Sequence, residues 1–526
     1  MSETPQERPQ RGEEVRRVTR PVFQAGADPL FPRSARWDSA ATQTLTDPYT
    51  QQPVAGLPLG DAQDVAAAVA RARDGLRAWE GRGDTSCKLA VLSAVIAGIK
   101  TRHEDLAQAI HREMGAPLAV ARSAQVDAAL AHLEATRAAL VAHETTTEVA
   151  QGGHFTHFEP LGVAALITPW NWPLNQIALK VGGALAAGCA MVLKPSEQAS
   201  LSGLIFAQVM AGALAAADAP QGLFSLVLGA GDTGAALVAA RGVDVISFTG
   251  STAVGRRIGA AAGGNLIPCA LELGGKSANI LFDDCDVDLA VTQGVAHCLR
   301  NSGQSCNAAS RMLVARAIYD RVVAKAAAES AAYDVASAGQ GGESPGARNP
   351  LGPLVNARQF AAVQDHIAQA LDEGARLVAG GLGRPEGVER GYFCKPTVFA
   401  DVTPEMAIFQ REVFGPVLVI TPFDSEDEAI ALANATDYGL AGYVQTRDPA
   451  RLARVGAQLR CGMVQANGQS RAAGAPFGGT GASGFGREAG IWGIRAFQRV
   501  KSLSGVPDFD RSFAGLHRQP PKNEPT

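Results

Sequence analysis

The chain has 526 residues, of which 46% are hydrophobic and 19% are charged, and its net charge is −4. This length suffices for about two to four domains, and the near balance of charge excludes the broad basic surface with which proteins bind nucleic acid or anionic lipid. The N-terminus lacks the apolar core of a signal peptide, and no stretch approaches the roughly 18 uninterrupted apolar residues of a membrane span. We therefore expect a soluble, cytoplasmic protein that acts on a small molecule, without a nucleic-acid or membrane partner.

The predicted elements begin after an aperiodic N-terminal stretch. Residues 1–35 and, at the other end, residues 509–526 mix Pro and charged residues without periodicity, so we expect flexible tails there. From about Asp61, Ala and Leu recur at helical spacing in DAQDVAAAVARARDGLRAWEG and in CKLAVLSAVIAGIKTRHEDLAQAIHREMG. This periodicity predicts amphipathic helices.

Short apolar runs alternate with helical stretches from about Gly162. The strand candidates are VAALIT, AMVLKP, FSLVLG and DVISFTG, with the helical LSGLIFAQVMAGALAAA between the second and the third. Repeated strand, helix and strand predict a doubly wound parallel sheet. Such sheets bind ligands beyond the C-terminal ends of their strands.

The same alternation returns after Glu272. It comprises SANILF, a helix from Val287 to Arg300, RMLVA, GPVLVITPF and the helical SEDEAIALANA. We therefore expect a second α/β domain, with the glycine-rich QGGESPGARNPLG forming surface loops.

Eight cysteines are scattered through the chain without a CxxC pair or a neighbouring histidine cluster. This pattern favours neither a disulfide framework nor a metal site, so we expect no metal and mostly buried, inert thiols. Cys306 differs because it follows the small polar segment NSGQS, where a thiolate is accessible to a substrate. Its alternative interpretation is a structural cysteine.

Two other polar residues are candidates for catalysis. Glu272 ends the run IPCALEL before two glycines, where it is either a salt-bridge partner or a general base in a partly desolvated cleft. Asn171, within TPWNWP, is either a turn residue or an amide donor to an oxyanion.

Two glycine-containing turns are candidates for binding phosphate. Gly229–Gly234 spells GxGxxG after a strand, but the acidic residue expected about 20 positions later is missing, since Asp244 is too near. We prefer a turn that packs near a cofactor by another geometry. Thr249-Gly250-Ser251 joins a strand to a helix whose free N–H groups suit a pyrophosphate, although an ordinary Ser/Thr cap has the same pattern.

Seven segments, in order, resemble the aldehyde dehydrogenase superfamily over residues 36–508. They are TPWNWP, LKPSEQAS, SFTGSTAVG, LELGGKSANI, NSGQSCNAASRMLV, EVFGPV and PFGGTGASGFGREAG. The resemblance implies an α/β fold with a Rossmann-type cofactor domain, an α/β catalytic domain and a small β oligomerisation element. The likeness is greatest to bacterial catabolic members that act on oxo acids or semialdehydes.

The resemblance also implies the domain boundaries. The cofactor-binding domain would comprise residues 36–138 and 160–271, and the catalytic domain residues 272–487. The oligomerisation element would comprise residues 139–159 and 488–508, whose exposed-edge strands need a partner. A homodimer or homotetramer is therefore expected.

The family's catalytic roles match three residues of this chain. Cys306 matches the nucleophile, Glu272 the general base, and Asn171 the side-chain half of the oxyanion hole. The implied function is NAD(P)-dependent oxidation of an aldehyde to the carboxylate through a thiohemiacetal and a thioester on Cys306. The presence of Glu272 argues against the CoA-acylating branch of the family.

The implied cofactor contacts lie on both halves of the chain. They are Thr168, Pro169, Trp170, Lys194, Glu197, Gly231, Phe248, Thr249, Gly250, Ser251, Val254, Leu273, Glu412 and Phe414. Lys194 and Glu197 match the residues that hold the adenosine ribose, while Glu412 and Phe414 match the pair at the nicotinamide. Because a carboxylate at Glu197 accepts hydrogen bonds from a ribose hydroxyl but repels a 2′-phosphate, NAD is favoured and NADP is possible.

The candidate substrate contacts include departures from the family pattern. They are Trp172, Arg300, Arg471 and Phe477. Many relatives place an aromatic or small residue at the position of Arg300, and Arg471 falls in the loop that usually borders the substrate tunnel. We hypothesise that one or both arginines pair with the distal carboxylate of an ω-oxo acid or semialdehyde. The alternative is that both are solvated surface arginines.

Two functions from other classes are alternatives. The first is a cofactor-binding or structural protein that kept the fold but lost turnover, which the presence of the three catalytic candidates disfavours. The second is a thiol esterase that uses Cys306 and leaves the nicotinamide contacts idle. Production of reduced cofactor from an aldehyde separates the three functions.

Overall fold

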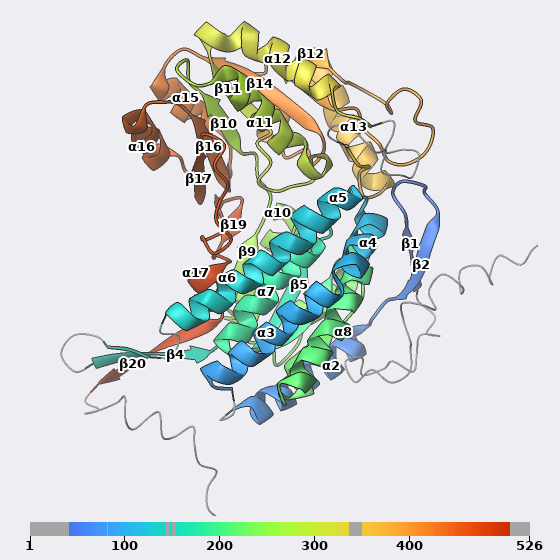
Figure 1. Cartoon of the computed structure of the whole chain (residues 1–526), viewed down its shortest axis with the longest axis vertical. Coiled ribbons are helices and arrows are strands. Elements are labelled where there is room, and N and C mark those ends of the chain that lie inside the picture. Colours follow the sequence, from blue (N-terminus) through green and yellow to red (C-terminus); the bar gives the residue numbers. More distant parts are fainter. Residues whose placement is uncertain (1–41, 81–82, 144–146, 150–153, 336–349, 505–526) are drawn as a thin grey trace, which may run out of the picture.

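The computed structural model describes residues 42–80, 83–143, 147–149, 154–335 and 350–504. Two lobes stand one above the other in Figure 1, joined by the chain as it leaves strand β9. The two expected tails and nearly all of the glycine-rich segment lie outside the described residues. Their predicted structure stays a prediction.

The lower lobe is built on a six-stranded sheet with the order β19-β9-β8-β5-β6-β7. Its strands are β5 (Val163–Thr168), β6 (Ala190–Pro195), β7 (Phe224–Leu226), β8 (Val245–Thr249), β9 (Cys269–Glu272) and β19 (Gly484–Phe485). All but β19 run parallel, which confirms the predicted doubly wound sheet. The strand order reverses at β5, between β6 and β8, and such a switch point is where these sheets bind ligands.

Helices pack against this sheet, either directly or as a second layer on other helices. They are α2 (Ala62–Trp79), α3 (Thr85–Thr101), α4 (His103–Met114), α5 (Leu118–Val120), η2 (Ala121–Asp127), α6 (Ala128–Ala142), α7 (Pro173–Ala187), α8 (Ser200–Ala216), α9 (Gly231–Ala239) and α10 (Thr252–Gly264). The second long stretch predicted as helical is interrupted at Arg102, which ends α3 and precedes α4.

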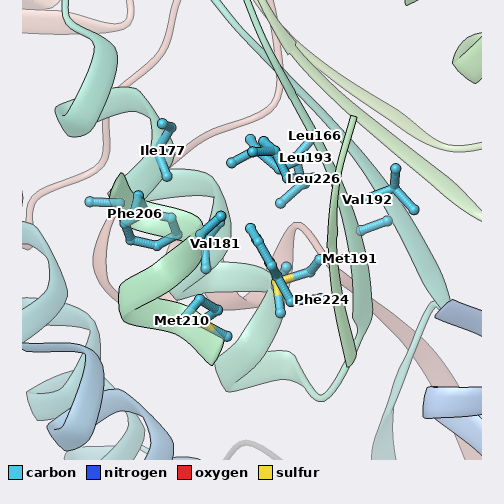
Figure 2. Close-up of a cluster of buried hydrophobic side chains, with 14 of the residues drawn as sticks. Leu166, Ile177, Val181, Met191, Val192, Leu193, Phe206, Met210, Phe224 and Leu226 are labelled. Atoms are coloured by element: carbon cyan, nitrogen blue, oxygen red, sulfur yellow. The ribbon is translucent and has the colours of Figure 1, made fainter. Parts of the chain in front are cut away.

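The core of the lower lobe lies between this sheet and helices α7 and α8. Figure 2 shows Leu166, Leu193 and Leu226 from three neighbouring strands facing Phe206 and Met210 of α8. Every residue of β5 and β6 is buried, which explains why VAALI and AMVL are continuously apolar in the sequence.

One segment of this lobe, Glu197–Ala216, is long and apolar enough to cross a membrane, although the sequence analysis expected no such stretch. In the fold, 72% of its apolar window is buried. That burial is typical of a core helix, and it accounts for the high hydropathy of α8.

The upper lobe contains a seven-stranded sheet with the order β12-β13-β14-β11-β10-β16-β17, parallel except for β12. Its strands are β10 (Ala278–Leu281), β11 (Arg311–Ala315), β12 (Arg376–Ala379), β13 (Thr397–Ala400), β14 (Val417–Phe423), β16 (Ala441–Gln445) and β17 (Met463–Ala466). Its helices are α11 (Val287–Leu299), α12 (Tyr319–Ala331), α13 (Ala357–Asp372), α14 (Ala407–Gln410), α15 (Glu426–Ala433) and α16 (Pro449–Gln458). The predicted second α/β unit is confirmed.

A third, smaller sheet projects from the lower lobe (Figure 1). It pairs β20 (Gln498–Ser504) with β4 (His154–Pro160) and β4 with β3 (Thr147–Val149), all antiparallel. The remaining strands and α-helix of the described residues are β1 (Thr42–Thr46), β2 (Pro53–Pro58), β15 (Tyr438–Gly439), β18 (Thr480–Gly481) and α17 (Gly490–Arg495). The expected α/β fold with a small β element is therefore confirmed, while the exact domain boundaries and the role of the small sheet in oligomerisation stay predictions.

Candidate active site

Cys306 follows a tightly constrained loop at the C-terminal end of α11. Asn301 and Ser302 adopt the left-handed conformation, with φ of 54° and 58°, which non-glycine residues rarely adopt. A side chain at Gly303, where φ is 73°, would collide with the carbonyl of Gly415. The loop is thus held in one conformation, as active-site loops often are.

Buried amides hold this loop in place. Gln304 is fully buried, donates to the carbonyl of Asn301 (3.2 Å) and accepts from the N–H of Val355 (2.9 Å). Its own carbonyl accepts from Asn171 Nδ2 (2.9 Å), and Asn301 Nδ2 donates to the carbonyl of Asn171 (2.9 Å). Asn171 is therefore fixed to the residue two positions before Cys306, and this hydrogen bond uses one of the two hydrogens of its amide.

Side chains on the other side hold the segment that follows Cys306. Tyr443 Oη donates to the carbonyl of Asn307 (2.8 Å), and His297 Nδ1 accepts from the N–H of Ala309 (3.2 Å). Burial lowers the pKa of His297 to about 4, with Arg300 acting in the same direction. His297 is consequently neutral near pH 7, which its acceptor role requires.

Burial raises the pKa of the Cys306 thiol, and the carboxyl groups of Glu412 and Glu272 raise it further. The backbone N–H groups of Cys306 and Asn307 oppose this effect. The thiol form is therefore favoured in the protein without ligands, and a base must remove its proton before the sulfur can attack a carbonyl.

Glu272, at the end of β9, is the candidate for such a base. Its side chain is 1% exposed, and neither carboxyl oxygen has a hydrogen-bond partner among the described residues. Burial raises its pKa well above the usual range, and the nearby Glu488 adds to the shift. An unpaired buried carboxyl group with a raised pKa is typical of a catalytic acid or base rather than of a salt bridge.

A buried ion pair lies close to Glu272. Lys180 Nζ donates to Glu488 Oε1 (2.5 Å) and to Ser247 Oγ (3.0 Å), with no exposed surface. The positive charge of Lys180 lowers the pKa of Glu272, opposite to the effect of Glu488. The pair thus places one charge of each sign beside the candidate base.

Cys306 opens onto a cavity of about 450 Å³ between the lobes. Its wall includes the four predicted substrate residues Trp172, Arg300, Arg471 and Phe477, and eight amide side chains. Among the described residues, no carboxylate belongs to this wall. Asn171 and Glu272 are not part of the wall; they are buried, with 4% and 1% of their surface exposed.

The two arginines of this wall differ in their bonding. Arg471 donates from Nη1 to the carbonyls of Ala472 (3.0 Å) and Ala475, and its guanidinium lies over the ring of Phe477 at 5.3 Å. The guanidinium of Arg300 lies over the ring of Trp172 at 5.7 Å, and no hydrogen bond or ion pair joins this guanidinium to another described residue. Arg471 is therefore partly used to shape its loop, whereas the guanidinium of Arg300 makes no such bond.

The predicted adenosine contacts follow strand β6. Lys194 is buried and donates to the carbonyls of Pro195 (2.9 Å) and Gly229 (2.6 Å), which ties it to the glycine-containing turn. Burial lowers the pKa of Lys194 to about 8, although Glu197 acts in the opposite direction. Glu197 is partly exposed, and Gly231 is exposed at the start of α9.

Asp244 is committed to structure. It pairs with Arg73 (2.5 Å) and accepts from the N–H of Val163 (2.7 Å). This bonding supports the prediction that the GxGxxG turn does not use Asp244 as the usual ribose-binding acid.

The segment after β8 places the next group of predicted contacts at the same edge of the sheet. Ser251 caps α10 by accepting from the N–H of Val254 (3.4 Å), so the ordinary cap interpretation holds for this residue. Thr249 is buried and donates to Gln176 Oε1 (3.1 Å). A side chain at Gly250 would collide with the Phe248 ring, so a glycine is needed for close packing. Val254 and Leu273 pack into the core of the lower lobe.

The predicted nicotinamide contacts, Glu412 and Phe414, lie near other predicted cofactor contacts from the lower lobe. The rings of Trp170 and Phe414 meet edge to face at 5.4 Å, and Phe414 adopts a positive φ of 56°. Glu412 accepts from the N–H of Gly275 (3.1 Å), and burial raises its pKa to about 7. Thr168 and Pro169 precede Trp170 at the end of β5, and the buried Thr168 Oγ1 has no hydrogen-bond partner among the described residues.

Comparison with known proteins identifies this arrangement. A model of the aldehyde dehydrogenase family matches residues 37–503. The chain belongs to the aldehyde dehydrogenase family.

Individual relatives cover nearly the same part of this aldehyde dehydrogenase. The 3-succinoylsemialdehyde-pyridine dehydrogenase of a Pseudomonas species is 43% identical over 463 residues, which are 88% of the chain and 94% of the relative. The crystal structure of an aldehyde dehydrogenase from Bartonella henselae superposes with a TM-score of 0.85 at 42% identity, covering 89% and 96% of the two chains. A cysteine-to-alanine mutant of aldehyde dehydrogenase C from Pseudomonas syringae, in complex with NAD+ and octanal, gives 0.84 at 41% identity, covering 89% and 94%.

Several residues of this aldehyde dehydrogenase site were missed by the sequence analysis. Gln304, His297 and Tyr443 hold the cysteine loop, and Lys180 and Glu488 form the ion pair near Glu272. Gln304 stands inside a motif that the sequence analysis used, so its amide could have been noticed. The partners in the ion pair are 308 positions apart, and no local pattern reveals them.

Eight free cysteines are present, and the described residues contain no group of three or more His, Cys, Asp and Glu side chains suited to a metal. The assignment of individual catalytic, cofactor and substrate roles stays a prediction, because family membership does not by itself test each residue.

Proposed function

We propose that this aldehyde dehydrogenase uses NAD to oxidise an aldehyde to the carboxylate, with Cys306 as nucleophile and Glu272 as general base. One observation carries the proposal. The Cys306 thiol lies at the cavity wall, and the Asn171 amide is hydrogen-bonded to the carbonyl of Gln304, two positions before it. The buried carboxyl group of Glu272, which has no hydrogen-bond partner among the described residues, is close enough to raise the pKa of that thiol. Each of the three groups has the chemistry that acyl transfer to water requires.

The residues present fit a dinucleotide. Helix α9 begins without a side-chain cap, so its first N–H groups are free to bind a phosphate oxygen. Thr168 Oγ1 is a buried hydroxyl without a partner, and Gly231 leaves open space beside α9. NAD is proposed over NADP because the Glu197 carboxylate would repel a 2′-phosphate, and a solved relative at 41% identity is in complex with NAD+.

The first step is nucleophilic addition. Glu272 accepts the proton of Cys306, and its raised pKa makes it a stronger base than an exposed carboxylate. The sulfur then forms a bond to the carbonyl carbon, and the carbonyl electron pair moves to oxygen. The free hydrogen of the Asn171 amide and the N–H of Cys306 stabilise this alkoxide, as an oxyanion hole does.

The second step is oxidation followed by hydrolysis. Bound NAD supplies the acceptor for the hydride that leaves the thiohemiacetal carbon. The alkoxide electron pair re-forms the carbonyl, which leaves a thioester on Cys306. Glu272, having lost its proton to solvent, removes a proton from water; the hydroxide adds to the thioester carbon, and the C–S bond breaks to release the carboxylate.

We propose an aldehyde with an anionic or strongly hydrogen-bonding distal group as substrate. The wall of the cavity carries two arginines and eight amides without a carboxylate, and Arg300 has donors left for a ligand. Burial lowers the pKa of both wall histidines, His132 and His297, to about 4, so the arginines supply the positive charge. The distal carboxylate of an ω-oxo acid or semialdehyde would be attracted by the arginines and would accept their hydrogen bonds. A relative at 43% identity is named for a semialdehyde. Another relative, at 41% identity, is in complex with octanal, which is a neutral aldehyde and supports the alternative of an uncharged substrate.

Location and assembly are also proposals. All eight cysteines are free, which fits the reducing cytoplasm. The small sheet has an exposed face on β20, and a homodimer or homotetramer would cover it.

The test is cofactor reduction by wild type and Cys306→Ala, each with NAD and NADP and with aliphatic, aromatic and ω-carboxylated aldehydes. We expect NADH formation in the wild type and none in Cys306→Ala, with NAD binding retained. Ester hydrolysis without NADH formation would support the esterase instead. NAD binding without turnover of any aldehyde would support a protein that has lost catalysis.

A further inference from the structure

Glu197 lies in a short turn that connects β6 to α8. The turn forms one 3-10 segment, η3 (Glu197–Ala199), and Ser196 caps it by accepting from the N–H of Gln198 (3.2 Å). The N–H of Ser196 donates to the carbonyl of Thr168 (2.9 Å), which fixes the start of the turn to the neighbouring strand.

Helix α8 begins immediately after this turn without a cap of its own. Its N-cap residue is Ala199, whose backbone (φ −137°, ψ 36°) separates η3 from α8. Alanine has no side-chain acceptor, so the first N–H groups of α8 need a partner from elsewhere in the fold.

Glu113 of helix α4 supplies that partner. Its side chain is fully buried, and Oε2 accepts from the N–H of Leu201 (2.7 Å) and of Ser202 (3.2 Å). Oε1 accepts from the hydroxyl of Ser202. A carboxylate at a helix N-terminus is also favoured by the helix dipole. Burial raises the pKa of Glu113 to about 8, and these three donors oppose the shift.

We propose that Glu113 is a positioning residue for the adenosine end of the cofactor site. It anchors the first turn of α8 and thereby holds the adjoining turn that carries Glu197. The inference rests on the proposed role of Glu197 in binding the ribose. Because the contacts of Glu113 are with α8 and not with the cysteine loop, its loss acts on the cofactor more than on the chemical steps.

The test compares Glu113→Gln with a matched cap removal in the other lobe. Gln keeps the volume but places an NH2 group where one acceptor oxygen stood. Ser425→Ala removes the N-cap of α15, which accepts from the N–H of Glu428 (3.2 Å), far along the chain from the cofactor turn. Both variants lose one helix cap, so both should lower the melting temperature.

We expect Glu113→Gln to raise the KM for NAD about tenfold, with kcat and the aldehyde KM within about twofold of wild type. Ser425→Ala should change none of these constants. An unchanged KM for NAD in Glu113→Gln, or equal changes in KM and kcat, would overturn the inference. If Glu113→Gln fails to fold, Ser202→Ala removes only the hydroxyl donor, and the KM for NAD should then rise about twofold to threefold; no rise would overturn it too.

Glu197→Gln separates this inference from the proposed function. If Glu197→Gln leaves the preference for NAD over NADP unchanged, the proposed ribose site is wrong. If Glu197→Gln alters that preference while Glu113→Gln leaves the KM for NAD unchanged, the ribose site stands and the positioning role of Glu113 is wrong.

Discussion

The two sides of Cys306 are built in different ways. The cofactor side consists of short turns at the ends of β5, β6 and β8, where N–H groups, one lysine and one glutamate lie within a few positions of each other. The aldehyde side is a cavity whose wall combines residues from separate elements, including η2, α6, α7, α11, β16, β17 and the loop at residues 468–471.

Because of this difference, we expect the cofactor side to serve the reaction with every aldehyde and the aldehyde side to decide which aldehydes are accepted. Strand ends and helix starts are backbone features, so the cofactor side depends on the fold and only weakly on individual side chains. The polarity of the aldehyde side depends on side chains that can be exchanged without moving the sheets. Variants at the catalytic centre should therefore affect every substrate, and variants of the cavity wall only some.

The largest effect is expected at the centre that both sides share. Glu272→Gln should lower kcat by about 10³-fold with every aldehyde, because removing a general base usually costs 10²- to 10⁴-fold. Because Glu272 is proposed to accept the proton of Cys306 and later that of water, both the first formation of NADH and the steady-state turnover should slow in stopped-flow measurements. A burst of NADH at the wild-type rate before slow turnover would contradict the role of Glu272 in deprotonating Cys306 and leave only its role in activating water.

The pH dependence of kcat tests the same role of Glu272. Glu272 acts in its ionised form, and burial raises its pKa, so wild-type kcat should fall as the pH drops through a value well above that of an exposed glutamate. Glu272→Gln should lack this limb. If kcat of Glu272→Gln falls at low pH as it does in the wild type, the fall must come from another group. One such group is Glu412, whose pKa is raised to about 7 by burial.

Asn171→Ala should have the next largest effect, lowering kcat about 10²-fold for all aldehydes, as loss of one oxyanion-hole donor does. The change also removes the hydrogen bond to the carbonyl of Gln304, so loop disorder must be separated from lost catalysis. Gln304→Leu is the control, since it removes the side-chain hydrogen bonds of Gln304 but keeps the Asn171 amide. If Gln304→Leu lowers kcat as strongly, Asn171 acts by holding the loop.

The arginines test the aldehyde side alone. Arg300→Met should raise the KM for an ω-carboxylated aldehyde about 30-fold, as expected when a charged hydrogen bond is lost, and leave a neutral aldehyde of equal length unchanged. Arg471→Met should raise the KM of both aldehydes, because it also releases the carbonyls of Ala472 and Ala475. If Arg300→Met changes the KM of both aldehydes equally, Arg300 does not bind the distal carboxylate and is a solvated arginine.

The same contrast explains what the sequence could predict. The parallel strands were predictable because β5 and β6 are buried on both faces and therefore read as continuous apolar runs. The break between α3 and α4 at Arg102 was not, because no glycine or proline marks it. The missing α8 cap was equally hidden, since Ala199 is ordinary in sequence and its substitute, Glu113, comes from a distant helix.

Within the site, local motifs indicated Cys306, Glu272 and Asn171, whose roles the site geometry supports. Residues that act through long-range contacts, such as His297 on Ala309 or Tyr443 on Asn307, leave no local pattern. The two arginines were noticed as departures from the family, but only the fold shows that Arg471 binds its own loop while Arg300 does not.

The smallest effect is expected for a charge on the cofactor side. Glu197→Gln should lower the KM for NADP about tenfold by removing repulsion of the 2′-phosphate, and raise the KM for NAD a few-fold, as one weakened hydrogen bond does. The ratio of KM values between carboxylated and neutral aldehydes should stay the same, because Glu197 does not belong to the wall of the cavity. Higher salt should reduce the wild-type discrimination, since Glu197 is partly exposed and its field is screened. A change in aldehyde preference in this variant would show that the two sides are coupled and that the separation between them fails.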